Sequence, residues 1–445
     1  MRGPNPPRDA RYFPRIFIPF SPSWHWHFPP GQGKIDALRL AFRPMIYLDH
    51  NATTPPLPEV VDAVARWQRD AFANPGSRHA AGRRARQVLE QARESLAALL
   101  GAFPDEVVFT SGGTESNNAA LLGFCQGTPG TIALTPGEHP AVLETCRSLA
   151  ARGYTLYELP VDAAGQLIDD GLLPDPAGGP PRLPPQTRLV AVLLAHNETG
   201  VLQSVGPLAH ACLRQRVPLH LDALQAVGKI PVDFHALQAA TLAVGAHKFG
   251  GPRGVGALLV RRGTRLAPTL FGGHQEEGRR PGTEPVPLIA GMALALELSL
   301  RDHATRVARL TRLRDLLEAG LRERCPPVVL NGSREQRLPN TLNVAFPGVD
   351  GEALLVALDL AGIACSLGST CASGSAEPAP ILVAMGVPPE WLLSAVRFSL
   401  GPDTSDAEIH TAIERISRTV TALRSVQPAS LSAAGSGPPR RGPHG

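Results

Sequence analysis

Lysine is so scarce in this chain that each one is a candidate for chemistry. Lysine and arginine together number 43, yet only Lys34, Lys229 and Lys248 are lysines. Arginine stays protonated and cannot form a Schiff base, so such a chain keeps a lysine where an amine nucleophile is needed. Lys34 lies in an irregular N-terminal stretch, and Lys229 precedes Pro231 in what we expect to be a solvated surface loop. Lys248 follows the apolar run 241–244 and is the predicted nucleophile.

A strand-to-helix turn predicts an anion site in the motif VVFTSGGTESNN, residues 107–118. The strand ends, residues 111–114 turn, and a helix begins near Glu115, which brings free backbone N–H groups and the positive end of a helix dipole together. The motif lacks the lysine and the spacing of a P-loop, which argues against a nucleoside triphosphate. An ordinary helix N-cap is the alternative interpretation.

A carboxylate closes another apolar strand in the motif HLDALQAVGK, residues 220–229. Asp222 could cap a helix, bind a metal or pair with a protonated ring nitrogen. A metal is disfavoured because no second ligand residue lies nearby at suitable spacing. Together with the anion-binding turn and Lys248, Asp222 completes a set that matches the phosphate, the pyridine nitrogen and the aldehyde of pyridoxal 5'-phosphate. The sequence therefore predicts this cofactor and no resident metal.

One cysteine has the surroundings of a mobile nucleophile. Cys371 lies in GIACSLGSTCASGSAEPAPIL, residues 362–382, among Gly, Ser, Thr and Ala without apolar periodicity. A thiol on such a polar loop is typical of a nucleophile that must move. Cys365 follows an apolar run and suits either a packed residue or a resolving thiol. The remaining cysteines suit the core, and no pair has the CxxC spacing of a zinc or redox site; they are Cys125, Cys146, Cys212 and Cys325.

These groups need a scaffold of alternating strands and helices. Residues 84–100 have apolar residues at helical spacing before Gly101. Such alternation predicts an α/β domain with a mainly parallel sheet and a ligand beyond the carboxyl ends of its strands. Residues 286–324 are predicted to be mostly helical and to lead into a smaller α+β unit. The expected strands are Val107–Thr110, Leu189–Ala195, Leu219–Asp222, Thr241–Val244 and Val255–Val260.

Composition divides the chain into a folded body and two appendages. Of 445 residues, we expect 60–300 to form a large cofactor-binding domain, and 45–59 with 301–425 to form a small domain that carries the cysteine loop. Residues 1–44 are predicted to be a disordered extension or a start assigned too early, and 427–445 a disordered tail. Residues 173–187 are predicted to be a surface loop.

Charge and hydropathy exclude several classes of protein. The net charge is +4, but residues 1–44 hold seven bases and two acids, and residues 427–445 add two arginines and no acid. The intervening body is therefore acidic, and the basic balance is no evidence for nucleic acid. The sequence shows neither a signal peptide nor a long apolar span. A reducing, cytoplasmic location without membrane contact is expected.

From about Met45 to Leu423 the sequence resembles the cysteine desulfurases, class V pyridoxal-phosphate enzymes with the aspartate-aminotransferase-like fold. The long loop around Cys371 resembles the group that serves iron–sulfur cluster assembly. The resemblance rests on the motifs YLDHNATTP, TSGGTESNN, EHPAV, HNETG, DALQAVGK, AHKFGGPRGVG, RRPGTE, GSTCASGSAEP and VRFSLG.

The resemblance implies a role for each site residue. Lys248 would hold the cofactor, Asp222 would pair with the ring nitrogen, and Gln225 would bind the phenolic oxygen. His139 would stack on the ring and take part in catalysis. Gly113, Thr114 and His247 would bind the phosphate, and in a homodimer Thr283 of the partner subunit would bind it as well. Asn197 would lie near the ring and the substrate, and Arg397 would bind the substrate carboxylate.

The implied reaction converts L-cysteine to L-alanine. Lys248 would move the α-proton, and the Cys371 thiolate would attack the substrate sulfur and become a persulfide. An iron–sulfur scaffold or a tRNA-thiolation protein would receive that sulfur. The only metal contact expected is a transient one between Cys371 and an iron–sulfur cluster. Selenocysteine lyase is an alternative, as is a class V aminotransferase, which would not use Cys371. A non-catalytic scaffold is disfavoured because no expected catalytic position is missing.

One position departs from the family pattern. The family commonly has a phosphate-binding serine two residues before the His-Lys pair, where this chain has Gly245. The loss of one hydrogen bond predicts a modest loss of cofactor affinity.

Overall fold

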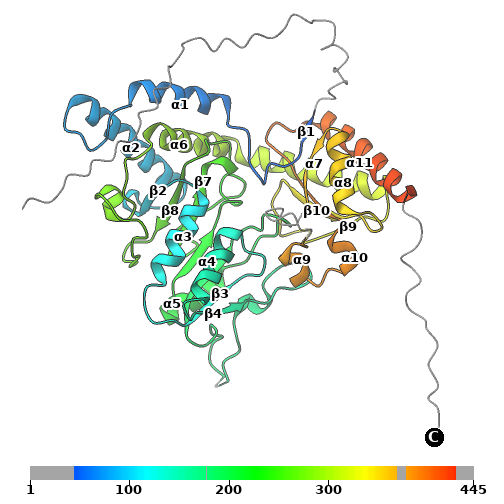
Figure 1. The fold of residues 1–445 in the computed structure, drawn as a ribbon, viewed down its shortest axis with the longest axis horizontal. Helices are drawn as coiled ribbons and strands as arrows, with labels where there is room; N and C mark the ends of the chain where they lie inside the picture. The colour runs from blue at the N-terminus through cyan, green and yellow to red at the C-terminus, as the bar shows by residue number, and fades with distance from the viewer. Residues whose placement is uncertain (1–44, 177, 368–376, 427–445) are drawn as a thin grey trace, which may run out of the picture. The chain divides into compact units, whose positions relative to one another are not determined.

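A seven-stranded sheet lies at the centre of the computed structural model, which describes residues 45–176, 178–367 and 377–426 (Figure 1). Within these residues, one strand runs antiparallel to both neighbours and the other six share one direction, so the sheet is mainly parallel, as predicted. The exception is β8. In spatial order the strands are β2 (Val107–Thr110), β8 (Gly256–Val260), β7 (Thr241–Gly245), β6 (Leu219–Asp222), β5 (Thr187–Leu193), β3 (Thr131–Leu134) and β4 (Thr155–Glu158).

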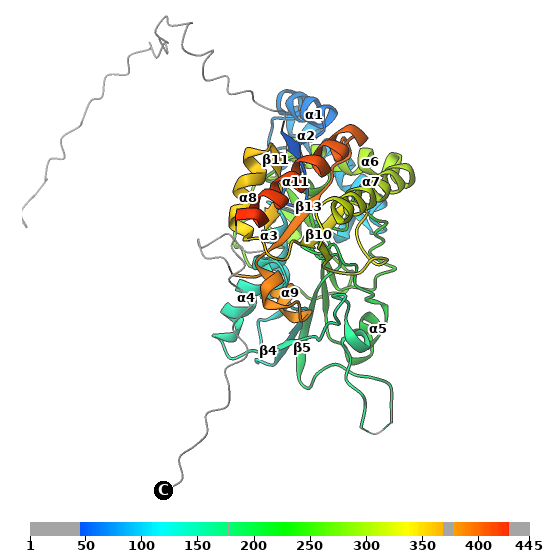
Figure 2. The same ribbon diagram turned by 90° about the vertical axis from the view of Figure 1, so that its right-hand side faces the viewer.

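Both faces of the sheet are buried by helices. Along β5, Val190 and Val192 join one apolar core while Leu189 and Ala191 join another, because successive side chains point to opposite faces. Figure 2 shows α5 and α6 on one side of the sheet and α3 and α4 on the other. The first face is covered by α1 (Pro58–Asp70), α2 (Ala80–Leu99), α5 (Gly206–Gln215) and α6 (Val286–Arg301), and the second by α3 (Gly113–Phe124) and α4 (Pro140–Ala150).

Capping residues fix where these helices begin and end. The ring of His79 accepts a hydrogen bond from the N–H of Gly82, so α2 begins four residues before the predicted start at residue 84. Gly101 follows the helix at φ +62°, a conformation that glycine adopts without strain. His139 caps α4 in the same way, accepting from Ala141 N at 3.1 Å. This cap orients a ring that the sequence assigned to the site.

A second apolar core joins the two ends of the described chain. Here β1 pairs with β11 in parallel, so the N-terminal strand lies against the C-terminal part. The four-stranded antiparallel sheet is β12 (Ser366–Leu367), β13 (Ala395–Ser399), β10 (Thr341–Ala345) and β9 (Val329–Leu330). The other elements are β1 (Ile46–Tyr47), β11 (Ile363–Ala364), α7 (His303–Arg324), α8 (Gly351–Leu360), α9 (Pro380–Ala384), α10 (Pro389–Leu392) and α11 (Asp406–Val426), with short 3-10 turns at Pro104–Glu106 (η2), Ile168–Gly171 (η3), Ala246–Lys248 (η4) and Gln275–Gly278 (η5).

The predicted elements agree with this architecture. The five expected strands correspond to β2, β5, β6, β7 and β8, and the helical stretch 286–324 contains α6 and α7. The described residues of the stretch 173–187 are mostly exposed, and they include a bridge between Leu173 and Arg182. The described residues fall in one compact unit, so the division into a large and a small domain stays a prediction. None of the helices in the described ranges is long and apolar enough to cross a membrane.

Candidate active site

Five of the predicted site residues lie at one edge of the central sheet. Asp222 ends β6, Lys248 follows β7, and Gly113 begins the helix after β2. His139 and Asn197 lie in the connections after β3 and β5. Because these strands share one direction, their carboxyl ends meet at the same edge. Burial lowers the pKa of His139, the charge of Asp222 opposes this effect and that of Lys248 adds to it, which makes the three side chains neighbours.

The Lys248 amine is largely buried and is held by backbone carbonyls. Its Nζ donates to the carbonyl oxygens of Asn51 at 2.6 Å and Ala52 at 2.9 Å. Burial lowers the pKa of Lys248 to about 8, with a further lowering by Arg397, and Asp222 partly opposes both effects. About a tenth of Lys248 is therefore the neutral amine at pH 7, far more than for an ordinary lysine, and this is the nucleophilic form.

The Asp222 carboxylate is buried and is oriented by two donors. One oxygen accepts from the N–H of Leu224 at 3.0 Å, in a turn and not at the start of a helix, and the other accepts from Asn117 Nδ2 at 2.7 Å. Asn117 is held in turn by His220, whose pKa falls to about 3 through burial. A carboxylate has about four acceptor sites, so Asp222 can still accept from a ligand. Asn117 and His220 were missed in the sequence. Each is a polar residue inside an apolar element, Asn117 in a buried helix and His220 in a buried strand, and this could have identified them.

The turn at the start of α3 has the form expected of an anion site. Gly112 adopts φ +150°, and a Cβ on Gly113 would lie 2.0 Å from Leu224 Cδ2, so the local path requires glycine. The first N–H groups of α3 have no partner within the helix. A Cβ on Gly245 would lie 3.7 Å from the N atom of Gly113, so the turns after β2 and β7 meet. Thr114 is exposed beside them.

Two residues assigned to the phosphate differ in how the fold positions them. His247 directly precedes Lys248, and its ring lies 3.1 Å from Thr53 Oγ1. Burial, then the charge of Lys248, lowers the pKa of His247 to about 4, so its ring is neutral at pH 7. Thr283 is exposed in the connection before α6, and none of the interactions found among the described residues links it to the other site residues.

Arg397 on β13 is enclosed by two carboxylates. Its Nη2 donates to Asp49 Oδ1 at 2.8 Å, and its Nη1 donates to Glu198 Oε1 at 2.7 Å and to the carbonyl of Asn197 at 3.2 Å. Burial raises the pKa of Glu198, although Arg397 opposes this. Asn197 Oδ1 is buried without a partner in the described residues. Arg397 Nε is buried without a partner in the described residues, so a substrate carboxylate would meet a free donor beside two competing carboxylates. Neither of these carboxylates was foreseen from sequence.

The prediction that Lys229 is a solvated surface residue is wrong. Lys229 is 9% exposed, and its Nζ donates to Asn51 Oδ1 at 2.8 Å and to Gln225 Oε1 at 2.5 Å. Gln225 Nε2 donates to the carbonyl of Asn51 at 2.9 Å. The turn that carries Lys229 packs beneath the N-terminal segment, and amide oxygens replace the water that the amine would otherwise bind. Asn51 was missed, although it stands in the motif YLDHNATTP.

The cysteines fall into three groups. Cys371 lies outside the described residues. Cys125, Cys146, Cys212 and Cys325 are buried and free, which confirms their assignment to the core. Cys365 is half-buried against the second core, and burial raises its pKa to about 12, so its thiol stays protonated at neutral pH. Such a thiol is a poor nucleophile.

Comparison with known proteins identifies the family. The profile of the class-V aminotransferases matches residues 46–411. A cysteine desulfurase of Trichormus azollae is 43% identical over 393 residues, which cover 88% of this chain and 96% of the relative. The chain belongs to the cysteine desulfurases of the class V aminotransferase family. A solved NifS-like protein is 32% identical with a TM-score of 0.77, covering 85% of this chain and all of the other. The structure titled SspA in complex with cysteine is 30% identical with a TM-score of 0.69, covering 81% and 99%.

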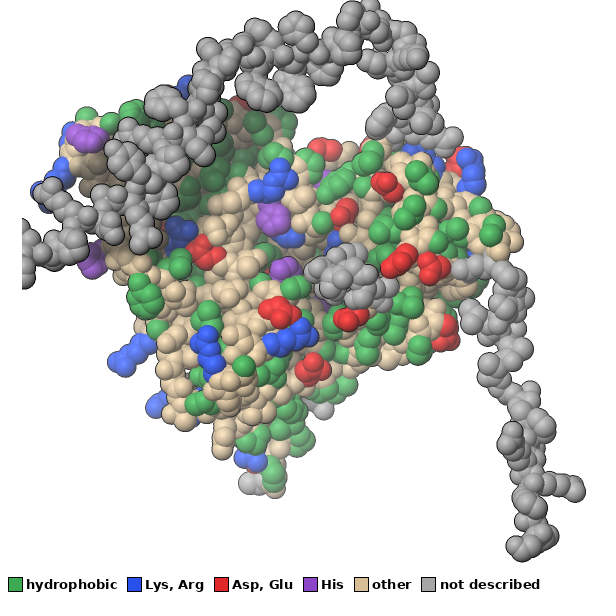
Figure 3. Space-filling view, in the orientation of Figure 1, with side chains coloured by type: hydrophobic (Ala, Val, Ile, Leu, Met, Phe, Trp, Pro, Cys, Tyr) green, Lys and Arg blue, Asp and Glu red, His purple; other side chains and the backbone are tan. Residues whose placement is uncertain are grey.

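As a cysteine desulfurase, the chain is a pyridoxal-phosphate-dependent sulfurtransferase, and the sheet edge fits that cofactor. Lys248 supplies a largely buried amine for the aldehyde, and Asp222 a buried carboxylate for the ring nitrogen. The turn at Gly113 offers N–H groups for the phosphate. The unpartnered Oδ1 of Asn197 lies on the same side, at a point where a ligand would satisfy it. Figure 3 shows histidine and basic side chains gathered near the middle of one face, with acidic side chains beside them.

Proposed function

We propose that this cysteine desulfurase removes the sulfur of L-cysteine through Lys248 and Cys371, and that it releases L-alanine and leaves a persulfide on Cys371. The observation that carries the proposal is the Lys248 amine, with a pKa near 8, beside Asp222 and His139 at the sheet edge. The solved relative bound to cysteine supports the substrate. Selenocysteine lyase and amino-group transfer are the alternative reactions.

The residues at the edge would hold the cofactor, which supplies an electron sink when bound. Lys248 would bind it through its amine and then move the α-proton of the substrate. Asp222 would keep the ring nitrogen protonated, and Gln225 would donate to the phenolic oxygen. His139 would cover the ring face, since the cap on α4 occupies its Nδ1 and fixes the ring. Gly113, Thr114 and His247 would bind the phosphate, with Thr283 of the partner subunit.

The sulfur transfer balances without an added oxidant. The substrate carboxylate would bind Arg397 beside Asn197, and the Cys371 thiolate would attack the substrate sulfur. The S–S bond forms as the C–S bond of the substrate breaks. The electron pair of the broken C–S bond stays on the carbon and becomes a C–H bond of alanine. The thiol of Cys371 thereby becomes a persulfide, and one proton is supplied to the product. Arg397 suits this role because its planar group binds a carboxylate with two hydrogen bonds.

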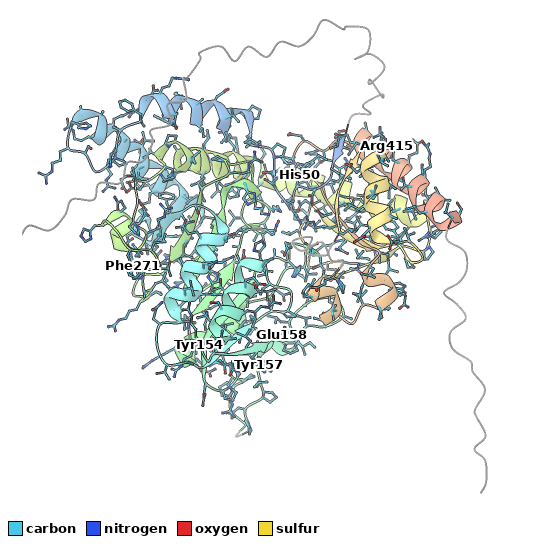
Figure 4. The ribbon with its side chains drawn as sticks, in the orientation of Figure 1. His50, Tyr154, Tyr157, Glu158, Phe271 and Arg415 are labelled. Carbon is cyan, nitrogen blue, oxygen red and sulfur yellow. The ribbon has the colours of Figure 1, made fainter. Side chains whose placement is uncertain are left out.

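A homodimer would complete this site. Thr283 is exposed in its own chain, and Phe271, 89% exposed, lies in the connection between β8 and α6 (Figure 4). Aromatic residues are enriched at protein contact surfaces, which supports this assignment. Light scattering should give twice the mass of one chain, and a monomer at micromolar concentration would contradict the shared site.

We place the enzyme in the cytoplasm, with an iron–sulfur scaffold or a tRNA-thiolation protein as sulfur acceptor.

The test is the production of alanine from L-cysteine by the cofactor-loaded enzyme, with the wild type beside Cys371→Ala. Alanine from the wild type alone, with a persulfide on the Cys371 peptide in mass spectrometry, is the expected result. Alanine from both proteins would mean that sulfur leaves without Cys371. A keto acid in place of alanine would identify an aminotransferase, and a much faster reaction with selenocysteine would favour the lyase.

A further inference from the structure

The buried Lys229 and the partly exposed Lys248 both contact one residue, Asn51. Lys229 Nζ donates to the side-chain oxygen of Asn51, and Lys248 Nζ donates to the backbone oxygen of the same residue. Both lysines also line one cavity of about 280 Å³ between the two cores. His50, labelled in Figure 4, precedes Asn51 and lines the same cavity. Lys229 therefore belongs to the surroundings of the predicted nucleophile.

Burial of Lys229 is costly and calls for an explanation. Among the ion pairs found in the described ranges, none includes Lys229, and its two partners are neutral amides. The charged or titratable groups that act on it or feel its charge are basic; they are Lys248, Arg397, His50 and His247. An apolar side chain of the same length would avoid this cost. The amine is therefore not explained by stability alone.

The amine decides which way the Gln225 amide faces. The oxygen and nitrogen of a carboxamide occupy similar positions, so only the hydrogen-bond partners distinguish the two orientations. Lys229 Nζ donates to Oε1 of Gln225, and the backbone oxygen of Asn51 accepts one Nε2 hydrogen. The second Nε2 hydrogen is left for a ligand. With Lys229 in place, Gln225 offers a ligand a donor and withholds its acceptor.

We propose that Lys229 is a positioning residue that fixes the Gln225 amide, so that an N–H donor faces the phenolic oxygen of the cofactor. The proposal rests on the cofactor role of Gln225 given above. A donor at that oxygen stabilises its anionic form, as hydrogen bonds to a charged form do. Without the fixed donor the anionic form of the phenolic oxygen is less stable. The pH-dependent change in the visible absorbance of the bound cofactor should therefore move to higher pH.

The test is a pH titration of the visible absorbance of the cofactor-loaded protein. Lys229→Met keeps the side-chain length and removes the donors. We expect the midpoint to rise by roughly 0.5 to 1 pH unit, the size of one hydrogen bond. Lys229→Gln is the second variant if Lys229→Met does not fold, since its shorter side chain does not reach both amide oxygens. The midpoint temperature of thermal unfolding should stay unchanged or rise, because the variant no longer buries an amine that has no carboxylate partner.

A double-mutant cycle separates positioning from the simple loss of a charge. If Lys229 acts through Gln225, Lys229→Met shifts the midpoint in the wild type but hardly at all in Gln225→Ala. Equal shifts in both backgrounds would mean that the charge acts through space, and this would overturn the proposal. So would an unchanged midpoint in Lys229→Met. A wild-type protein that takes up no colour would instead overturn the proposed function, and the inference with it.

Discussion

The sheet edge and the arginine cluster hold their charges in opposite ways. At the edge, Lys248 and Asp222 are held by backbone and amide groups, so each keeps its charge or lone pair for a ligand. In the cluster, Arg397 is already paired with Asp49 and Glu198. The edge is therefore prepared for a cofactor that stays bound, whereas in the cluster a substrate carboxylate must compete with two resident carboxylates for Arg397. We expect changes at the two places to affect different measured quantities.

The largest effect in this comparison is expected from Arg397→Lys. A lysine offers a single charged point and cannot bind a carboxylate with two parallel hydrogen bonds. We expect the KM for L-cysteine to rise by roughly 10- to 100-fold, the range of a lost charged hydrogen bond, with a smaller change in kcat. Steady-state alanine formation measures both quantities.

Asp49→Asn is the matched control in the same cluster. It removes a competing carboxylate and leaves Arg397 intact, so KM should stay unchanged or fall. A loss of kcat without a rise in KM in Arg397→Lys would contradict the distinction between the two regions.

The next effect is the pH dependence of cofactor uptake by the cofactor-free protein. Lys248 reacts as the neutral amine, and burial lowers its pKa to about 8. Below that pH the amine is protonated, so the uptake rate should increase about tenfold per pH unit up to pH 8 and then level off. Stopped-flow absorbance measures the rate. A rate that continues to rise towards pH 10 would show an ordinary lysine and an edge that does not prepare its nucleophile.

The smallest effect is expected from Gly245→Ser. Gly245 adopts φ −131°, which any residue tolerates, and a Cβ there would lie 3.3 Å from Leu224 Cδ2, a contact that a small shift relieves. The added hydroxyl lies near the N-terminus of α3 and should tighten cofactor binding about threefold to tenfold, the value of one hydrogen bond. Equilibrium titration of the cofactor-free protein measures this change. Unchanged affinity would mean that backbone N–H groups already satisfy the phosphate at this position.

The sheet edge was largely predictable because its signals are local. Each of Asp222 and Lys248 follows its own apolar strand in the sequence, and the carboxyl ends of parallel strands must meet. The order of strands, the single antiparallel strand β8 and the helix bounds required the structure. The Asn117 support of Asp222 joins positions 105 apart, which no local pattern links.

The arginine cluster and Lys229 show what the sequence alone does not contain. Arg397 and Asp49 are 348 positions apart and meet because β1 lies against the C-terminal core. Lys229 is buried by Asn51, 178 positions earlier, and its own neighbours in the sequence resemble those of a surface turn. Burial of a polar residue depends on which distant segment covers it. The assignment of Lys229 to the surface from its local sequence was therefore wrong. The assignment of Lys248 as the nucleophile stays a prediction with which the geometry is consistent.

The most direct measurement is to identify the lysine that binds the cofactor. Borohydride reduction of the coloured protein fixes pyridoxal phosphate covalently to its amine, and peptide mass spectrometry then locates it. We expect the added mass on the peptide that contains Lys248, and we expect Lys248→Ala to show neither the label nor the colour. A label on Lys229, whose amine also contacts Asn51, or a coloured Lys248→Ala protein would contradict the assignment of Lys248 as the residue that binds the cofactor.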